Sequence, residues 1–539
     1  MPGKIVQRPA RARPTVVLVA RVTLAVILAG LWGEWPAGAA DPTASSAVDL
    51  RPFGIRVVDQ DTGRGVPLVE LRTVNEIRYV TDSAGYVAFR EPELMPGRVF
   101  FQVRSHGYEF PADGFGFRGT VLDAQPGGSA TLKVRRQQLA ERLYRITGSG
   151  TYADSQLLGH AVPPRSVRRQ GQVLGSDSIV CTLHRDRVYW FWGDTQRPDY
   201  PLGNFHVPGA TTPRPGPGRW SPQTDIPLEY FLGENGRAKE TAHLPGDGPT
   251  WIGGLASLPD AAGRECLLAA YEKIQPPLTV AARGLAEFDD ERREFRVVRE
   301  IPIDAPLRPQ GHPLRRHENG VEYVYFGEPF PWIRVIATRE AYLDLAQYEA
   351  YTALRSRSAS EPAVVERDEQ SRPKFAWRRG GRPWSLDGER QLLQADQLKP
   401  AEALGRLIDP ATGKEVRAHR GSVAWNEFRQ RWIAILVEWG GSSSLLGEVW
   451  YTESLEPQGP WQRAIKIATH DHYSFYNPKH HPFLDEDGGR RIYFEGTYTR
   501  TFSGNADATP RYEYNQILYR LDLEKLPPSA WFSTAANAP

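Results

Sequence analysis

The chain has 539 residues, of which 66 are basic, 64 acidic and 11% aromatic. The balanced charge lacks the basic excess of nucleic-acid-binding proteins, so we expect no nucleic-acid partner. With two cysteines the chain has too few for a disulfide framework, which leaves either one bridge between Cys181 and Cys266 or two buried free thiols.

Residues 1–40 have the pattern of a secretory signal peptide. Basic side chains between Lys4 and Arg13 precede an apolar stretch from Val16 to Trp32, and small residues follow. This order predicts cleavage after Ala39 or Ala40. A retained N-terminal anchor is the alternative. We therefore expect an exported protein, periplasmic or extracellular, with no stable membrane insertion after cleavage.

Residues 51–135 follow a short linker (41–50) and predict a β-sandwich accessory domain. Short segments rich in β-branched and aromatic residues alternate with Gly, Pro and Asp turns. The predicted strands are Phe53–Val58, Val66–Arg72, Ile77–Thr81, Tyr86–Arg90, Arg98–Val103 and Ala130–Val134. The turns in 58–67 and the segment Tyr79–Phe89 resemble the transthyretin-like or carboxypeptidase-regulatory-like domains of secreted bacterial proteins. That resemblance implies an accessory or spacer role.

Residues 136–149 read as a charged, weakly helical linker, and residues 150–526 as a second all-β domain ending in a tail (527–539). Many strands without alternating helices favour a closed β-propeller, which has no long exposed edges. The strands in this region are predicted at Arg187–Trp192, Glu265–Tyr271, Ala281–Phe288, Glu322–Phe326, Arg431–Trp439, Glu448–Glu453, Arg490–Glu495 and Gln516–Leu523. The length favours five blades, with seven as the second choice. Arg339–Leu354 is the only helix that we predict.

Two aspartates occupy opposed positions in a predicted hairpin formed by residues 173–183 and 187–193. A turn centred on Arg185 and Asp186 pairs Leu183 with Val188, and the same register brings Asp177 opposite Asp194. Side chains opposed in this way have Cβ atoms roughly 4.5 to 5.5 Å apart, and like charges there are destabilising. Two neighbouring carboxylates also separate their pKa values, as acid–base catalysis requires. Capping of turns by both aspartates is the structural alternative.

The segments Gly175-Ser-Asp177 and Trp192-Gly-Asp194-Thr resemble the first-blade signature of five-bladed propeller glycoside hydrolases, especially the endo-D-arabinanase-type family. The resemblance implies that Asp177 and Asp194 flank the scissile bond. A carboxyl separation of about 5 to 5.5 Å favours a retaining reaction, and about 6.5 to 9.5 Å an inverting one. The register favours the shorter distance, and a β-bulge would shift it.

A second dense region spans residues 470–498. Tyr476, Asn477, Lys479 and His480 combine aromatic surface with hydrogen-bond donors and are predicted substrate contacts. His480 and His481 point to opposite faces of a strand, and the pair His470 and His472 is too small to define a metal site, so a metal remains unassigned. No other cofactor is predicted.

Three further residues complete the predicted site. Glu495 ends an aromatic strand much as Asp194 does, and it is the third catalytic candidate, as general acid. Glu328 follows an aromatic residue and a glycine in the same way, and Arg334 could hold a hydroxyl or a carboxylate; both are predicted to bind substrate. A blade-closing hydrogen bond for Glu495 and ion pairing for the other two are the alternatives. The polar loop 501–516 is expected to border the cleft.

The sequence thus predicts an exported carbohydrate-active protein, a glycoside hydrolase with paired carboxylates at the centre of a propeller and a polysaccharide or oligosaccharide as its partner. A non-catalytic propeller that binds glycans or another surface is the first alternative. A polysaccharide lyase that relies on His480, Tyr476 and Arg334 is the second. Phosphate-loop, metalloprotease and nucleophile-elbow motifs are absent from the sequence.

Overall fold

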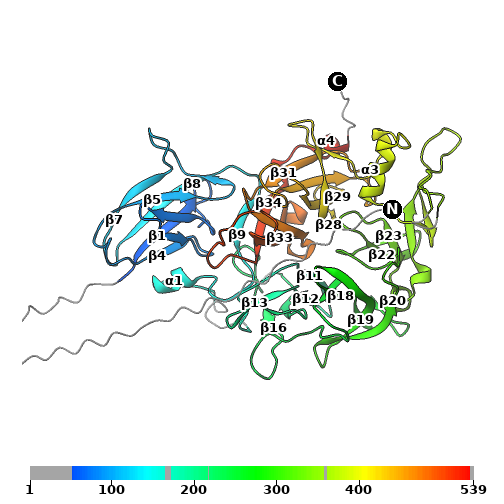
Figure 1. Cartoon of the computed structure of the whole chain (residues 1–539), viewed down its shortest axis with the longest axis horizontal. Coiled ribbons are helices and arrows are strands. Elements are labelled where there is room, and N and C mark those ends of the chain that lie inside the picture. Colours follow the sequence, from blue (N-terminus) through cyan, green and yellow to red (C-terminus); the bar gives the residue numbers. More distant parts are fainter. Residues whose placement is uncertain (1–50, 164–170, 217, 357–360, 534–539) are drawn as a thin grey trace, which may run out of the picture. The chain divides into compact units, whose positions relative to one another are not determined.

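The computed structural model describes residues 51–163, 171–216, 218–356 and 361–533 (Figure 1). The predicted signal peptide, the linker 41–50 and the last residues of the tail (534–539) lie outside the described residues. Strands hold 44% of the residues and helices 8%, which confirms the all-β prediction. Among the described residues, no helix has the length and apolarity needed to span a bilayer.

The N-terminal region contains two four-stranded sheets. The first has the order β4-β1-β8-β6 and consists of β1 (Phe53–Asp59), β4 (Tyr86–Phe89), β6 (Tyr108–Glu109) and β8 (Ser129–Arg136). The second has the order β3-β2-β5-β7 and consists of β2 (Glu70–Thr73), β3 (Arg78–Val80), β5 (Gly97–Arg104) and β7 (Gly119–Ala124). Side chains from both sheets share one apolar core, with Ile55 and Val57 from β1, Leu71 from β2 and Phe101 from β5. Alternation of buried and exposed positions along β5 explains why one face of that sheet joins the core.

Five antiparallel sheets of four or five strands follow one another along the rest of the described chain. The first sheet contains β11 (Val180–His184), β12 (Arg187–Phe191), β15 (Gly209–Pro213) and β16 (Glu229–Tyr230). The second contains β17 (Thr250–Pro259), β18 (Glu265–Gln275), β19 (Thr279–Asp289) and β20 (Glu294–Ile301). The third contains β21 (Leu314–Glu318), β22 (Val321–Phe326), β23 (Ile333–Ile336), β24 (Glu349–Thr352) and β25 (Ala376–Arg379).

The fourth sheet contains β28 (Ala418–Asn426), β29 (Arg431–Glu438), β30 (Val449–Ser454) and β31 (Ala464–Ala468). The last contains β32 (Ser474–His480), β33 (Arg491–Thr499), β34 (Asn515–Asp522) and β9 (Glu141–Arg145). Two smaller sheets accompany them, made of β10 (Gly175–Ser176), β13 (Thr195–Arg197) and β14 (Tyr200–Asn204), and of β26 (Leu407–Ile408) and β27 (Glu415–Val416).

Strand β9 closes the last sheet with residues from the beginning of this region (Figure 1). Ile517 of β34 pairs with Arg145, and Leu518 pairs with Tyr144. All residues of β9 are buried, so the prediction of a weakly helical linker is wrong for this segment. Apolar residues in β9 do not recur at the spacing of an amphipathic helix. Its five consecutive buried residues are typical of a strand that is covered on both faces.

The predicted helix Arg339–Leu354 is wrong over most of its length. The segment forms α2 (Arg339–Leu343), the 3-10 turn η2 (Leu345–Gln347) and strand β24. The side chain of Asp344 accepts a hydrogen bond from the Ala346 N–H and begins the 3-10 turn, which ends the α-helix. Aromatic and β-branched residues follow and favour a strand.

The other helices were not predicted. The longest, α3 (Leu386–Gln394), begins at Ser385, whose hydroxyl accepts a hydrogen bond from the Gly388 N–H. The remaining helical segments are short: α1 (Ala153–Leu157), η3 (Pro400–Glu402), η4 (Pro482–Leu484), η5 (Asp487–Gly489), η6 (Leu523–Lys525) and α4 (Ser529–Ser533).

Candidate functional site

The hairpin that carries the two aspartates has the predicted register. Leu183 pairs with Val188 across β11 and β12. Arg185 and Asp186 have φ angles of 47° and 57°, as a two-residue type I′ turn requires. The first strand is not continuous over 173–183, because Ser178 has a φ of 49° and interrupts it between β10 and β11.

Asp177 and Asp194 are neighbours across the two strands, but the pairing there is irregular. Ser176 pairs with Thr195, and the next backbone N–H, that of Asp177, donates to the carbonyl of Asp194 at 3.2 Å. The Gly193 N–H donates to the carbonyl of Asp177 at 2.9 Å. Asp177 therefore bonds to both Gly193 and Asp194 of the partner strand, the pattern of a β-bulge.

Gly193 allows the Asp177 carboxylate to lie against the hairpin. A Cβ atom at this position would lie 2.2 Å from Asp177 Oδ1, closer than any real contact. No other residue fits there without displacing the carboxylate, because the neighbouring atom belongs to a short side chain with little freedom to move. The glycine of the Trp-Gly-Asp sequence thus has a role in positioning Asp177.

Two tyrosines hold the Asp177 carboxylate. The hydroxyl of Tyr476 donates to Oδ2 at 2.7 Å and that of Tyr514 donates to the same oxygen at 2.8 Å. Burial raises the pKa of Asp177, and the hydrogen bonds from the two tyrosines and from Ser178 oppose that rise. Hydrogen bonds to a carboxylate favour its ionised form. Tyr476 was predicted in the site; Tyr514 was not singled out, although it lies in the loop 501–516 expected at the cleft.

Asp194 is poised to carry a proton near neutral pH. Burial and, second, the charge of Asp177 raise the pKa of Asp194 to about 7, against a hydrogen bond from Trp251. Its Oδ1 atom is buried and has no hydrogen-bond partner among the described residues. Trp251, at the start of β17, is 36% exposed and was not predicted. The two aspartates therefore sit in different surroundings, one held by donors and one largely unsatisfied.

Asn477 joins the last sheet to the aspartate loop. Its side-chain amide donates to Ser178 Oγ at 2.7 Å, and the Ser178 N–H donates to Thr497 Oγ1 at 3.0 Å. Asn477 and Ser178 both have positive φ angles, of 50° and 49°. The structure thus gives Asn477 a contact with the loop that carries Asp177.

Glu495 lies in the core of the protein. It has no exposed surface, and burial raises its pKa to about 8 against the nearby charge of Lys479. His481 lies 2.7 Å from Glu495 through Nε2 and 3.4 Å from Cys181 Sγ through Nδ1. Because Glu495 has no exposed surface and lies against His481, these contacts match the blade-closing alternative, and its role as general acid stays a prediction.

Both cysteines are free thiols, which decides between the two alternatives. Burial raises the pKa of Cys181 to about 12, so this thiol stays protonated and inert at neutral pH. Cys266 is partly exposed, and its pKa is raised to about 11, chiefly by burial.

Arg334 is engaged within the third sheet. Its guanidinium pairs with Glu318 at 2.6 Å and with Glu349 at 2.8 Å. It also lies 4.0 Å from the centroid of the Tyr323 ring and 4.3 Å from that of Trp377. These contacts match the ion-pairing alternative, and the structure does not bring Arg334 to the aspartates.

Glu328 and His480 have different surroundings. Glu328 is exposed and lies 3.2 Å from the Arg420 guanidinium. His480 is buried, with Nε2 2.9 Å from Asp485 Oδ1 and its backbone N–H donating to Ser422 Oγ at 2.8 Å. The predicted substrate contact of His480 stays a prediction for a side chain that is buried here, whereas Glu328 is exposed.

Glycines bring the second and third sheets together near Trp251. The N–H of Gly254 donates to the carbonyl of Gly311 at 3.0 Å. Gly311 in turn forms a bridge with Gly327, the residue before Glu328. These backbone contacts place the segment that precedes β21 beside the start of β17.

Three residues of basic type, His312, Lys479 and Arg420, lie near one another beside these segments. His312 is partly exposed, and burial followed by the charges of Lys479 and Arg420 lowers its pKa well below the ordinary value. Lys479 lies on β32, three positions after Tyr476, which holds Asp177. Lys479 is buried, so its predicted contact with substrate stays a prediction; His312 and Arg420 are neighbours that the sequence analysis did not single out.

His470 does not offer a metal ligand. Its Nδ1 lies 3.0 Å from the carbonyl of Gly447 and its Nε2 2.8 Å from the hydroxyl of Tyr519. Both ring nitrogens are used, and the ring stacks on Phe475 with centroids 4.3 Å apart. His472, by contrast, is exposed, so the two histidines do not form one site.

No protein-family model and no curated protein matches the chain. Among solved structures, an exo-1,5-α-L-arabinanase from a bovine ruminal metagenomic library has 10% identity and a TM-score of 0.31, covering 64% of this chain and 93% of its own. An α-L-arabinofuranosidase from Fusarium graminearum has 10% identity and a TM-score of 0.31, covering 67% and 96%. A family 43 glycoside hydrolase from Bacillus licheniformis has 12% identity and a TM-score of 0.33, covering 64% and 71%. Because these scores are low, we infer the function of this chain from its own side chains.

Proposed function

We propose that this protein is an exported glycoside hydrolase that cleaves a polysaccharide or oligosaccharide with Asp177 and Asp194. The observation that supports this most is the contrast between the two carboxyl groups. Burial raises the pKa of both groups, but two tyrosine hydroxyls favour the ionised form of Asp177, whereas the charge of Asp177 raises the pKa of Asp194 further, to about 7. Neighbouring carboxyl groups whose pKa values are pushed apart supply an acid and a base at one pH.

The proposed fold is a β-sandwich followed by a five-bladed β-propeller. Two four-stranded sheets with a common core support the sandwich. Five successive antiparallel sheets, the last completed by β9, support five blades rather than seven. Pairing of an early strand with the last sheet removes a sheet edge, as ring closure requires.

In the proposed reaction, protonated Asp194 donates its proton to the glycosidic oxygen as the C–O bond breaks. Ionised Asp177 attacks the anomeric carbon and forms a glycosyl ester. Asp194 then removes a proton from a water molecule, and the resulting hydroxide attacks the anomeric carbon and breaks its bond to Asp177. This step releases the sugar, leaves Asp177 ionised and Asp194 protonated, and so restores both groups. The hairpin register favours this retaining course, because opposed positions predict the shorter carboxyl separation, which the bulge at Gly193 would change.

Substrate contacts are proposed from Trp251, Asn477 and Glu328, which are at least partly exposed, and from the buried Lys479. Trp251 offers an exposed aromatic face next to Asp194, and such faces suit the apolar side of a sugar ring. Asn477, Lys479 and Glu328 supply hydrogen-bonding groups from two other segments. The lyase alternative is less favoured, because Arg334 and His480, two of the groups on which it depended, are each held by a carboxyl group of the protein.

The test is release of reducing ends from a panel of arabinans, xylans, galactans and sulfated algal polysaccharides. Asp177→Asn and Asp194→Asn are compared with Asp186→Asn, a matched change in the exposed turn of the same hairpin. We expect the first two to lower the rate by about 10²- to 10⁴-fold and the control to keep it. Equal activity in all three variants would overturn the assignment. Binding of a polymer without cleavage by the wild type would instead support the glycan-binding alternative.

Export is proposed from the N-terminal sequence and has its own test. Expression of the whole chain with its N-terminal segment, followed by sequencing of the N-terminus of the exported protein, should give a first residue of Ala40 or Asp41. A protein that stays in the membrane fraction with Met1 intact would support the anchor alternative.

A further inference from the structure

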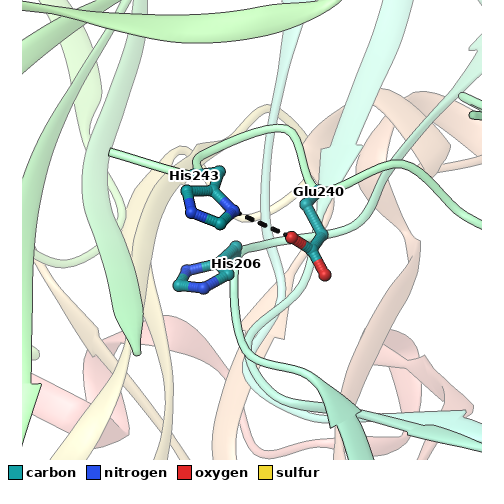
Figure 2. A group of neighbouring side chains, drawn as sticks. All are labelled: His206, Glu240 and His243. Atoms are coloured by element: carbon teal, nitrogen blue, oxygen red, sulfur yellow. Dashed lines mark hydrogen bonds and ion pairs between the residues drawn. The ribbon is translucent and has the colours of Figure 1, made fainter. Parts of the chain in front are cut away.

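Two histidines and a glutamate outside the aspartate pair lie together in Figure 2. His206 lies between β14 and β15, and Glu240 and His243 lie between β16 and β17. One ligand atom from each residue can be chosen so that all three lie within 4.8 Å of one another. Neither histidine belonged to a predicted site.

The three side chains face a common space that solvent can enter. The two imidazole rings lie one above the other with centroids 4.3 Å apart, and the Glu240 carboxylate lies beside them (Figure 2). His243 Nδ1 lies 3.0 Å from Glu240 Oε2. The side chain of His243 is 69% exposed and that of Glu240 34% exposed, so an ion has access to the group.

We propose that His206, Glu240 and His243 bind one divalent first-row transition cation, with zinc as the representative ion. Imidazole nitrogen and carboxylate oxygen are ligands that zinc accepts, and three protein ligands leave a fourth position for water. A set of two imidazoles and one carboxylate favours such ions over calcium or magnesium, which prefer oxygen ligands alone.

The backbone holds the two ligand-bearing loops together before any ion binds. The Ala242 N–H donates to the carbonyl of His206 at 3.0 Å, and the Thr241 N–H donates to the carbonyl of Val207 at 3.0 Å. The side chain of Asn204 accepts a hydrogen bond from the His206 N–H at 3.0 Å. Because these contacts tie the loop of His206 to that of His243, less conformational entropy is lost when a cation binds.

Neighbouring groups orient the ligands in the manner of an outer coordination shell. Arg197 lies 3.5 Å from Glu240 Oε1, the oxygen that does not face His243. The hydroxyl of Thr250 lies 3.4 Å from His206 Nδ1 and also accepts a hydrogen bond from Lys273 Nζ at 3.0 Å. Such partners fix carboxylate and imidazole orientation. The two positive charges oppose cation binding, so we expect an affinity weaker than that of a closed structural zinc site.

The proposed metal site is adjacent to the aspartate pair through β17. Thr250 begins this strand, and its N–H donates to the carbonyl of Phe205 at 2.9 Å. The next residue, Trp251, makes the hydrogen bond to Asp194. A bound cation would therefore hold the loop against which the start of β17 packs. The metal proposal does not depend on hydrolase activity.

The test uses the full exported chain after removal of metals by a chelator. Zinc binding is measured by calorimetry, and cobalt binding by the visible absorption that appears when Co²⁺ acquires protein ligands. We expect one equivalent of metal for the wild type. His243→Ala and Glu240→Gln should each weaken binding by at least about 10-fold, since even outer-shell changes cost that much. His317→Ala is the control, because this histidine is also exposed and lies in another sheet.

Folding of the variants is checked by circular dichroism, and the exposure of His243 makes its replacement the safer of the two changes. Absence of zinc and cobalt uptake by the wild type would overturn the proposal. Uptake that His243→Ala and Glu240→Gln retain with wild-type affinity would overturn it as well, because the ion would then bind elsewhere.

Discussion

Replacement of Asp177 by Asn tests the electrostatic coupling on which the proposed reaction depends. The change keeps the shape of the side chain and removes its charge. The Asp177 charge is the second cause, after burial, of the raised pKa of Asp194. We therefore expect the pKa of Asp194 to fall in Asp177→Asn but to remain above its ordinary value, because burial persists.

The size of the fall follows from Coulomb's law. The rise from 3.8 to about 7 in the pKa of Asp194 corresponds to about 4 kcal/mol between its two protonation states. Unit charges roughly 5 to 8 Å apart, at an effective dielectric constant of about 20, repel by about 2 to 3 kcal/mol. Removal of one charge should thus lower the pKa of Asp194 by at least about one pH unit.

The assay is a pH titration of the aspartate carboxyl carbons by nuclear magnetic resonance. The Asp194 signal in Asp177→Asn is assigned by its loss in the double variant with Asp194→Asn, and Asp186→Asn serves as the control in the wild-type background. This measurement does not require activity. An unchanged or higher pKa of Asp194 in Asp177→Asn would refute the coupling and, with it, the division of roles between the two aspartates.

Four further changes test other parts of the site. Since the pKa of Asp194 is higher in the folded than in the unfolded protein, the free energy of unfolding should fall as pH rises from 3.8 to about 7. Asp194→Asn should therefore be more stable than the wild type above pH 7, by at most about 4 kcal/mol. Equal urea midpoints of the two proteins above pH 7 would contradict this expectation. Tyr514→Phe removes one donor to Asp177 and should lower kcat/KM by roughly 10- to 100-fold, because a hydrogen bond to a charged group is worth about 1.5 to 3 kcal/mol. Wild-type kcat/KM in a folded Tyr514→Phe variant would contradict a role of this hydroxyl in holding Asp177. Gly193→Ala places a Cβ 2.2 Å from Asp177 Oδ1 and should reduce activity together with a stability loss of about 1 to 3 kcal/mol; wild-type values of both would mean that the carboxylate can move freely. Glu495→Gln should leave kcat within about 10-fold of the wild type, whereas a loss of 100-fold or more in a folded variant would support this residue as an acid.

The local features of the site could be predicted from the sequence, because they depend on residues close together in the chain. The turn at Arg185 and Asp186 sets the register of the hairpin, which holds from the pair Leu183–Val188 to the pair Ser176–Thr195 and brings Asp177 beside Asp194, although the Asp177 carbonyl pairs with Gly193. The all-β composition was equally clear, since β-branched and aromatic residues recur in short segments between turns. The failure at Arg339–Leu354 has a local cause as well, because a short helix ended at Asp344 and a strand followed.

The tertiary structure decided which residues share a site, because packing between distant segments has no local pattern. Tyr514 reaches Asp177 across 337 residues of sequence, and no periodicity near either residue reveals that contact. Glu495 and Asp194 both follow aromatic residues in the sequence, yet Glu495 lies in the middle of β33 and is fully buried, whereas Asp194 follows β12 and is partly exposed. Burial is set by the segments that pack against a strand, so it determines pKa and access to substrate only after the sheets have come together.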